Sequence, residues 1–392
     1  MNSRERILNS INHLPVDHVP LWLRFWPMHE GIDNIPFPWQ DQVARAASLV
    51  EQGLDDTLLL EPPLGYVEAY NADHVPGVRS RVRRLPPAAG EEYPLLEKVY
   101  DTPAGQLRQV VKITADWPHG NDVVLFSDFN IPRQKEAIIK DLADLARLEC
   151  LLGEPSDQQL YDFHERAVTL RRKAAELGVA LEGGWSALGD SAFWLLGMQR
   201  VLYAQMDEPA FVEALLDVLC EWELKRIDHL LDEGIDVLVH MAWYEGSDFW
   251  TPANYRRMLK PRLIRLIERA HAKGVKFRYI ITKGWKPLRK DFLEMGIDCL
   301  TGLDPVQDNA VLVEVKREIG DKICLMGGVN SSVMLTQWND DQIRRAVKDA
   351  VESLAPGSGF ILYPVDQVGD NLPWHKVQIL IDQWREISLK NQ

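Results

Sequence analysis

Short apolar segments alternate with helical segments along almost the whole chain, and this alternation constrains the fold more than any other feature. Eight segments are predicted to be buried strands, because each is a short apolar or β-branched run bounded by turn residues. They are residues 18–25, 56–60, 179–182, 236–240, 276–282, 299–303, 322–326 and 359–363. Helical patterns follow them, among them residues 42–53, 157–177, 287–295 and 341–354. The alternation predicts a parallel sheet, and eight repeats predict a closed (β/α)8 TIM barrel in the α/β class.

An open, doubly wound sheet is the main alternative for a chain of this pattern. Such a sheet usually carries a phosphate-binding glycine turn after an early strand. The sequence contains neither G-x-G-x-x-G nor G-x-x-x-x-G-K-[ST], so we favour the barrel. We expect residues 1–392 to form one domain. The alternation of strands and helices is interrupted at about 78–127. There, apolar and polar residues alternate with a period of two, with Pro, Gly and Asp between the segments, which predicts an antiparallel β insert.

Charge and composition exclude several classes of protein. The formal net charge is −14, so an acidic surface would repel the phosphates of nucleic acid. No apolar run approaches 18 residues, and no apolar segment follows the charged start, so neither a membrane span nor a signal peptide is expected. The four cysteines form no C-x-x-C pair and are too few for a disulfide framework. These features favour a cytoplasmic protein.

Ionisable residues follow the predicted strands at the end where TIM-barrel active sites lie. The candidate catalytic residues are Glu182, His240, Glu245, Lys283 and Asp366. An ammonium group at the end of an apolar strand needs a partner, and Glu182 or Asp366 could provide it for Lys283. His240 could instead be a core histidine, although Tyr244 and Glu245 in the same loop favour a site. We expect Glu182, His240, Lys283 and Asp366 to face one cavity.

Aromatic residues are also concentrated near the predicted strand ends, and the chain has 13 tryptophans. They could simply form the wall of the barrel mouth, or they could line an apolar pocket for a small organic substrate. The candidate substrate-binding residues are Arg24, Trp26, Trp185, Trp243, Tyr244, Tyr279 and Trp285.

Motifs spread along the chain resemble those of the uroporphyrinogen decarboxylase superfamily. They include Ser3-Arg4-Glu5-Arg6 with Asp17-His18-Val19-Pro20, then Gly327-Gly328-Val329, and the run from Leu354 to Leu362. Thr102-Pro103-Ala104-Gly105 is similar to the branch that contains corrinoid-dependent methyltransferases. The resemblance covers essentially the whole chain and implies a TIM barrel.

The resemblance also implies which activities fit the residues. True uroporphyrinogen decarboxylases carry two arginines, four residues apart, that hold substrate carboxylates, whereas Arg24 stands alone here. The methyltransferase branch often has a zinc site with His-x-Cys after strand five and another Cys on strand eight. Here Ile281 and Lys283 take the first two places and strand eight has no Cys, so neither that zinc site nor a thiol acceptor is expected. Oxygen and nitrogen ligands would also suit zinc, but no ligand spacing in the sequence identifies a metal.

Three functions remain. The resemblance favours a corrinoid-dependent methyltransferase that moves a methyl group from a small methylated substrate, such as an aryl methyl ether, to the cobalt of a separate corrinoid protein. A decarboxylase of a small carboxylated substrate is the alternative, with Asp366 or His240 protonating the carbanion and Arg24 or Lys283 holding a carboxylate. A non-enzymatic binding protein is the third, which the number of ionisable groups disfavours.

The expected corrinoid (cobalamin) is carried by a partner and is not resident. No histidine of the chain lies in the Asp-x-His-x-x-Gly motif of resident cobalamin domains. The corrinoid protein would therefore dock transiently over the barrel mouth. A homodimer is compatible with the sequence.

Overall fold

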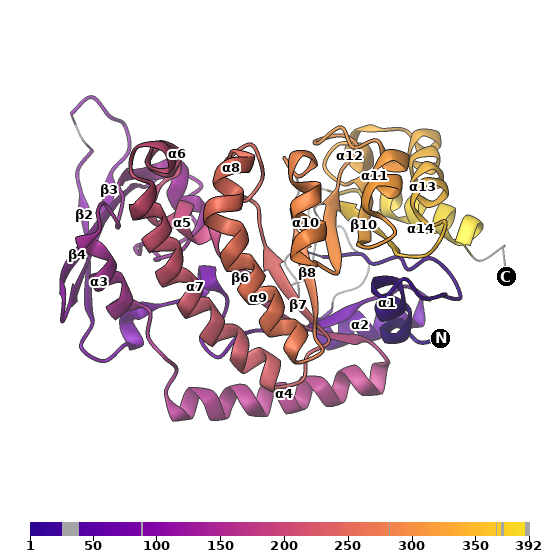
Figure 1. The fold of residues 1–392 in the computed structure, drawn as a ribbon, viewed down its shortest axis with the longest axis horizontal. Coiled ribbons are helices and arrows are strands. Elements are labelled where there is room, and N and C mark those ends of the chain that lie inside the picture. Colours follow the sequence, from indigo (N-terminus) through magenta and orange to yellow (C-terminus); the bar gives the residue numbers. More distant parts are fainter. Residues whose placement is uncertain (26–38, 88, 282, 366, 370–371, 389–392) are drawn as a thin grey trace.

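A curled, seven-stranded parallel sheet forms the centre of the computed structural model (Figure 1). The structure describes residues 1–392 except 26–38, 88, 282, 366, 370–371 and 389–392. In spatial order the strands are β1 (Thr57–Leu60), β6 (Ala180–Ala187), β7 (Val237–Met241), β8 (Lys276–Ile280), β9 (Cys299–Leu303), β10 (Cys324–Asn330) and β11 (Phe360–Val365). Almost every residue of these strands is buried, as expected of a parallel sheet covered on both faces.

The first predicted strand, residues 18–25, contacts both edges of this sheet. Leu21 forms a parallel bridge with Leu362 of β11, and Trp22 forms one with Asp55, just before β1. The predicted strand is therefore present as isolated bridges, while the other seven are regular strands. Pro20 contributes to the interruption, since it has no N–H to donate, although its carbonyl accepts from Leu362.

Strand β6 is longer than the sequence predicted, and this moves one predicted site residue. The prediction ended the strand at Glu182, before Gly183 and Gly184, but the strand continues to Ala187. The glycines allow close packing instead of a turn: a Cβ on Gly183 would lie 2.4 Å from Ile235 Cδ1. Glu182 consequently lies well before the carboxyl end of its strand.

Helices surround the sheet and mostly follow its strands. They are α1 (Ser3–Ile11), α2 (Gln42–Glu51), α3 (Ala143–Leu151), α4 (Asp157–Leu177), α5 (Gly189–Leu196), α6 (Met198–Asp207), α7 (Pro209–Asp232), α8 (Pro252–Asn254), α9 (Lys260–Ala272), α10 (Arg289–Met295), α11 (Leu312–Ile319), α12 (Met334–Gln337), α13 (Asp340–Leu354) and α14 (Trp374–Ser388). Within the described ranges, no helix combines the length and the apolar character that crossing a membrane requires.

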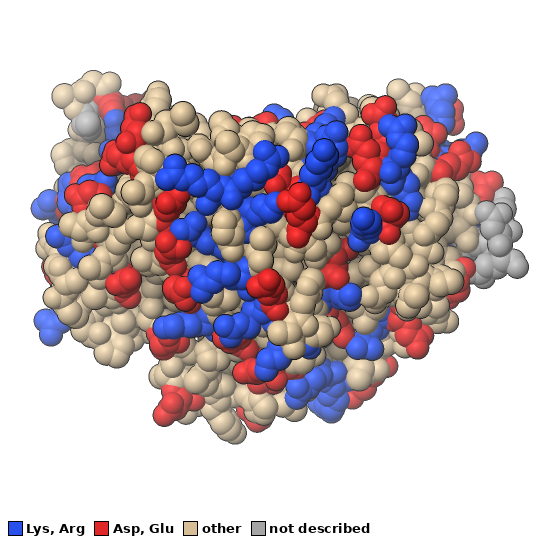
Figure 2. Space-filling view, in the orientation of Figure 1, with Lys and Arg blue, Asp and Glu red and all other residues tan. Residues whose placement is uncertain are grey.

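On the face of the molecule seen in Figure 2, Lys and Arg side chains are interspersed with Asp and Glu side chains. Ion pairs link neighbouring helices, for example Arg269 of α9 with Asp228 of α7 at 2.9 Å. Because such exposed pairs contribute little stability, burial of the apolar faces holds the helices in place.

A separate four-stranded antiparallel sheet lies beside the parallel one, at the left of Figure 1. Its strands are β2 (Arg79–Leu85), β3 (Leu95–Thr102), β4 (Gly105–Lys112) and β5 (Gln134–Glu136). The first three lie in the predicted 78–127 segment, and β5 extends the sheet beyond it. A 3₁₀ helix, η3 (Asp128–Arg133), precedes β5 and brings Asp128 to the cavity described next.

Candidate functional site

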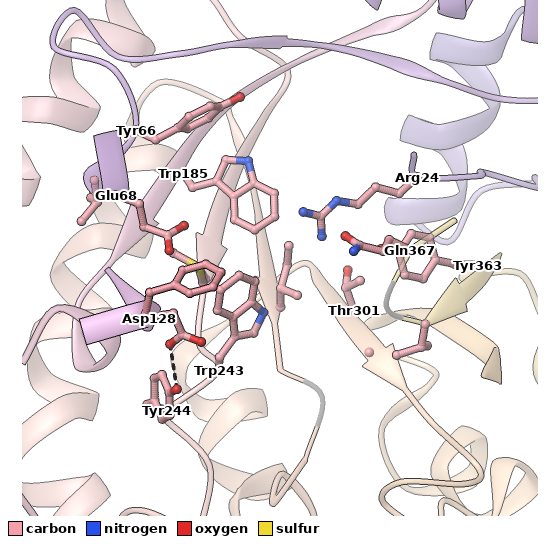
Figure 3. Close-up of a pocket in the computed structure, with 16 residues that line it drawn as sticks. Arg24, Tyr66, Glu68, Asp128, Trp185, Trp243, Tyr244, Thr301, Tyr363 and Gln367 are labelled. Carbon is pink, nitrogen blue, oxygen red and sulfur yellow. Dashed lines mark hydrogen bonds between the residues drawn. The ribbon is translucent and has the colours of Figure 1, made fainter. Parts of the chain in front are cut away.

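A cavity of about 530 Å³ is lined by residues of the loop after β1, of η3 and of the carboxyl ends of several parallel strands (Figure 3). Its described lining residues are Arg24, Tyr66, Val67, Glu68, Asp128, Phe129, Trp185, Met241, Trp243, Tyr244, Ile280, Thr301, Gly302, Tyr363, Val365 and Gln367. The volume suits a small organic molecule, and the cavity lies at the carboxyl ends of the strands, where the active sites of TIM barrels lie.

Aromatic rings form much of the cavity wall. Trp185 on β6 and Trp243 after β7 meet edge to face, with ring centroids 6.2 Å apart. The guanidinium carbon of Arg24 lies 4.2 Å from the centroid of the Trp185 ring. Figure 3 shows Arg24 entering the cavity opposite Glu68 and Asp128, with the two tryptophans between them. The cavity therefore has a cationic end, an aromatic wall and an acidic end.

Two carboxyl groups form the acidic end, and their surroundings differ. Burial, and then the nearby charge of Asp128, raise the pKa of Glu68 to about 7. Asp128 instead receives two donors on one oxygen, the Tyr244 hydroxyl at 2.7 Å and the Trp194 indole N–H at 3.2 Å. At neutral pH, Glu68 can thus supply a proton while Asp128 accepts hydrogen bonds.

The Asp128 charge should be measurable through Glu68. We expect Asp128→Asn to lower the pKa of Glu68 below 7, because the substitution removes a negative charge that disfavours ionisation of its neighbour. Carboxyl ¹³C chemical shifts followed against pH, with Glu68→Gln assigning the resonance, measure this shift. An unchanged or higher pKa would show that Asp128 does not set the titration of Glu68.

Four of the predicted substrate-binding residues line this cavity: Arg24, Trp185, Trp243 and Tyr244. Trp26 and Asp366 lie outside the described residues. Trp285 is only 1% exposed and does not line the cavity, since it packs into the main core.

Glu182 is buried within the curled parallel sheet and is not among the residues that line the cavity. Its carboxylate accepts from Arg278 at 2.9 Å and from the Thr57 hydroxyl at 3.3 Å. Burial raises the pKa of Glu182, and the charge of Arg278 opposes this. Continuation of β6 to Ala187 explains the placement, because Trp185 occupies the position nearer the cavity.

A hydrogen-bonded network of buried side chains lies beneath the cavity wall and joins His240, Glu245 and Tyr279. The Glu245 carboxylate contacts His240 Nε2 at 3.1 Å and accepts from the Tyr279 hydroxyl at 2.5 Å. Ser186 Oγ lies 2.9 Å from the other ring nitrogen of His240. The predicted grouping around His240 and Glu245 exists, but these side chains are buried and do not line the cavity.

Lys283 lies elsewhere, on an exposed loop, where it pairs with Asp248 at 3.2 Å. The expectation that Glu182, His240 and Lys283 face one cavity is therefore corrected by their positions, because two are buried in separate networks and one faces solvent. The catalytic role given to the five predicted residues stays a prediction.

Sequence reasoning missed Glu68 and Asp128. Neither lies at a strand end: Glu68 is in a short 3₁₀ helix (Val67–Ala69), and Asp128 begins η3 after the insert. The available signal was acidic residues beside aromatic ones in irregular segments, Tyr66-Val67-Glu68 and Asp128-Phe129. It is common to many loops, so only the fold singles these residues out.

A metal site would require several ligand side chains grouped in one place. In the part of the chain that the structure describes, no three His, Cys, Asp or Glu side chains are grouped to hold a metal ion. Ile281, where the zinc-site His would lie, has no donor atom, and it is buried in the core. The described residues therefore do not fit the family's zinc site.

A curled parallel α/β sheet with a cavity at its carboxyl ends, aromatic walls and an acid of raised pKa is typical of enzymes with TIM-like scaffolds. The sequence profile of the uroporphyrinogen decarboxylase (URO-D) family matches residues 120–387. The chain belongs to this enzyme family, as its motifs predicted.

Relatives of two kinds are similar to the chain. A uroporphyrinogen decarboxylase of Thioalkalivibrio sulfidiphilus is 25% identical over 98% of both chains. A methylcobamide:CoM methyltransferase, MtaA, of Methanosarcina barkeri is 24% identical over 49% of this chain, which spans 56% of that relative. The solved structure of a methyltransferase from Methanosarcina mazei aligns with a TM-score of 0.58 at 16% identity, covering 98% of this chain and 99% of the other. This structural likeness supports the fold.

Proposed function

We propose that the chain is a methyltransferase, on a closed (β/α)8 barrel, that moves a methyl group from a small aryl methyl ether to the cobalt of a separate corrinoid protein. The observation that carries the proposal is Glu68, an acid with a pKa of about 7 at the end of an aromatic-walled cavity. An ether oxygen is a poor leaving group, and a protonated acid beside it lowers the barrier to its departure.

The chain's residues have separate parts in this reaction. Trp185 and Trp243 hold the aromatic ring of the substrate, while Glu68 faces the ether oxygen. As the C–O bond breaks, its electron pair stays on oxygen, which takes the proton of Glu68 to give the phenol. The Co(I) corrinoid of the partner would supply the electron pair that takes up the methyl group. Asp128, next to Glu68, contributes to the raised pKa of Glu68, after burial.

Arg24 indicates the further chemistry of the substrate. Its guanidinium lies across the cavity from Glu68, against the Trp185 ring (Figure 3). A carboxylate on the far side of the substrate ring would pair with this cation. We therefore propose a methoxylated aromatic carboxylate, of which 4-methoxybenzoate is a simple representative.

Decarboxylation is the second candidate, favoured by the relative that spans the whole chain and by the same two residues. Arg24 would hold a carboxylate, and Glu68 would protonate the carbanion left by CO₂. Arg24 is the one cationic side chain among the described lining residues, beside two carboxyl groups. This balance disfavours a porphyrinogen with many carboxylates and favours a small acid.

The test compares related compounds as methyl donors to Co(I) cobalamin, followed by visible absorption: 4-methoxybenzoate, methoxybenzene and 4-methoxyaniline. We expect 4-methoxybenzoate to react best. In Arg24→Gln its kcat/KM should fall about 10- to 100-fold, the range expected for a lost charged hydrogen bond, with little change for methoxybenzene. Arg200→Gln, on exposed α6, is the matched control. Carbon dioxide release without cobalamin would assign the decarboxylase instead.

The partner proposal has its own readout. Because the corrinoid belongs to another protein, the purified chain should be colourless and should transfer no methyl group until a Co(I) corrinoid is added. Stoichiometric cobalt in the purified chain would contradict a transient partner. The homodimer stays a prediction for sedimentation measurements.

A further inference from the structure

The first turn of α5 and the cavity-lining loop after β7 are joined by hydrogen bonds in which buried carboxylates accept from backbone N–H groups. Asp190, near the start of α5, accepts from the backbone of Trp243 at 3.1 Å and of Tyr244 at 3.2 Å. In return Glu245, the next residue of that loop, accepts from the backbone N–H of Gly189 at 2.7 Å. Each of the two segments thus provides a carboxylate that accepts hydrogen bonds from the backbone of the other.

This arrangement is buried and leaves little room for adjustment. Asp190, Glu245 and His240 are each 0% exposed. A Cβ on Gly189 would lie 2.6 Å from Glu245 Cγ, so only glycine admits the Glu245 side chain here. Burial, and then the neighbouring Glu245 charge, raise the pKa of Asp190 well above its usual range.

Trp243 and Tyr244, whose backbone N–H groups donate to Asp190, both line the cavity. Trp243 lines the cavity against Trp185, and Tyr244 donates its hydroxyl to Asp128, the neighbour of Glu68. The loop on which both lie follows β7, and its next anchor is the Trp250 indole, which donates to the Tyr244 carbonyl at 2.7 Å. A small shift of this backbone would therefore move both the aromatic wall and the acidic end.

We infer that Asp190 and Glu245 form a reciprocal clamp that positions Trp243 and Tyr244 in the cavity, making Asp190 a positioning residue for substrate binding. The geometry of the clamp is independent of which reaction the cavity performs. Its effect on substrate rests on the proposed function, which supplies 4-methoxybenzoate as the ligand to be measured.

Three variants test the clamp in different ways. Gly189→Ala displaces Glu245 without changing any charge. Asp190→Asn keeps one carbonyl-type acceptor, whereas Asp190→Ala removes both. The matched control is Gly153→Ala, where a Cβ would come equally close, 2.5 Å, to Val75 Cγ2 but not to the clamp.

The first measurement needs no ligand. Hydrogen exchange of the Trp243 and Tyr244 amides should become at least tenfold faster in Gly189→Ala and Asp190→Ala, and stay unchanged in Gly153→Ala. Unchanged exchange in both clamp variants would overturn the inference, whatever the chain catalyses.

The second measurement separates positioning from general stability. The Kd for 4-methoxybenzoate should rise about tenfold in Gly189→Ala, and more in Asp190→Ala than in Asp190→Asn. Gly153→Ala, at a similar loss of Tm, should keep the wild-type Kd. If the loss of affinity simply parallels the loss of Tm across all four variants, Asp190 is a structural residue and not a positioning residue. Wild-type protein that does not bind the compound would refute the proposed substrate class, and the exchange rates would still decide the clamp.

Discussion

We expect Glu68→Gln to lower kcat for methyl transfer from 4-methoxybenzoate to Co(I) cobalamin by about 10²–10⁴-fold, the range that general acids typically contribute. Glutamine keeps the size of the side chain and removes its proton. Binding of the substrate ring depends on Trp185 and Trp243, so KM should change much less than kcat. Glu176→Gln, on the exposed outer helix α4, is the matched control and should behave as wild type.

The same residue predicts the pH dependence. The pKa of Glu68 is raised to about 7, and a general acid works in its protonated form. Activity should therefore be full below pH 7 and fall as the pH rises through 7. Glu68→Gln should lose this alkaline limb together with the activity. If the variant kept both kcat and the limb, another group would be the proton donor.

Breaking the Arg278–Glu182 pair should produce the largest loss of stability. The two side chains are 2.9 Å apart, and Arg278 also lies 4.5 Å over the Trp22 ring. Glu182→Ala leaves a guanidinium charge buried without its carboxylate, which typically costs about 3–5 kcal/mol in the free energy of unfolding. Denaturant unfolding measures the loss.

A second substitution distinguishes the lost charge partner from lost packing. Adding Arg278→Met to Glu182→Ala removes the stranded charge and should recover most of the loss. Lys283→Ala provides the surface comparison: because the Lys283–Asp248 pair is exposed, its removal should change stability by at most about 1 kcal/mol. A double variant no more stable than Glu182→Ala would mean that packing around the pair, not its charge, is what matters.

The site could be predicted only in part, and the reasons lie in particular residues. The sequence pointed to Trp185, Trp243 and Tyr244 because they follow or end apolar strands, and these residues do line the cavity. Glu182 looked like a strand-end acid because two glycines follow it. The close approach of Ile235 and Val239 to those glycines, which no local pattern reveals, keeps the strand going and buries Glu182.

The sequence by itself determined the order of strands and helices, because burial of apolar residues with a regular period is a local property. It also determined the family, through motifs spread along the chain. Only the tertiary structure decided which carboxyl groups meet in the cavity. Glu68 and Asp128 are 60 positions apart and come from irregular segments, and the raised pKa of Glu68 exists because folding buries it beside Asp128. Burial and charge proximity are properties of the folded chain, so the candidate acid could be recognised only there.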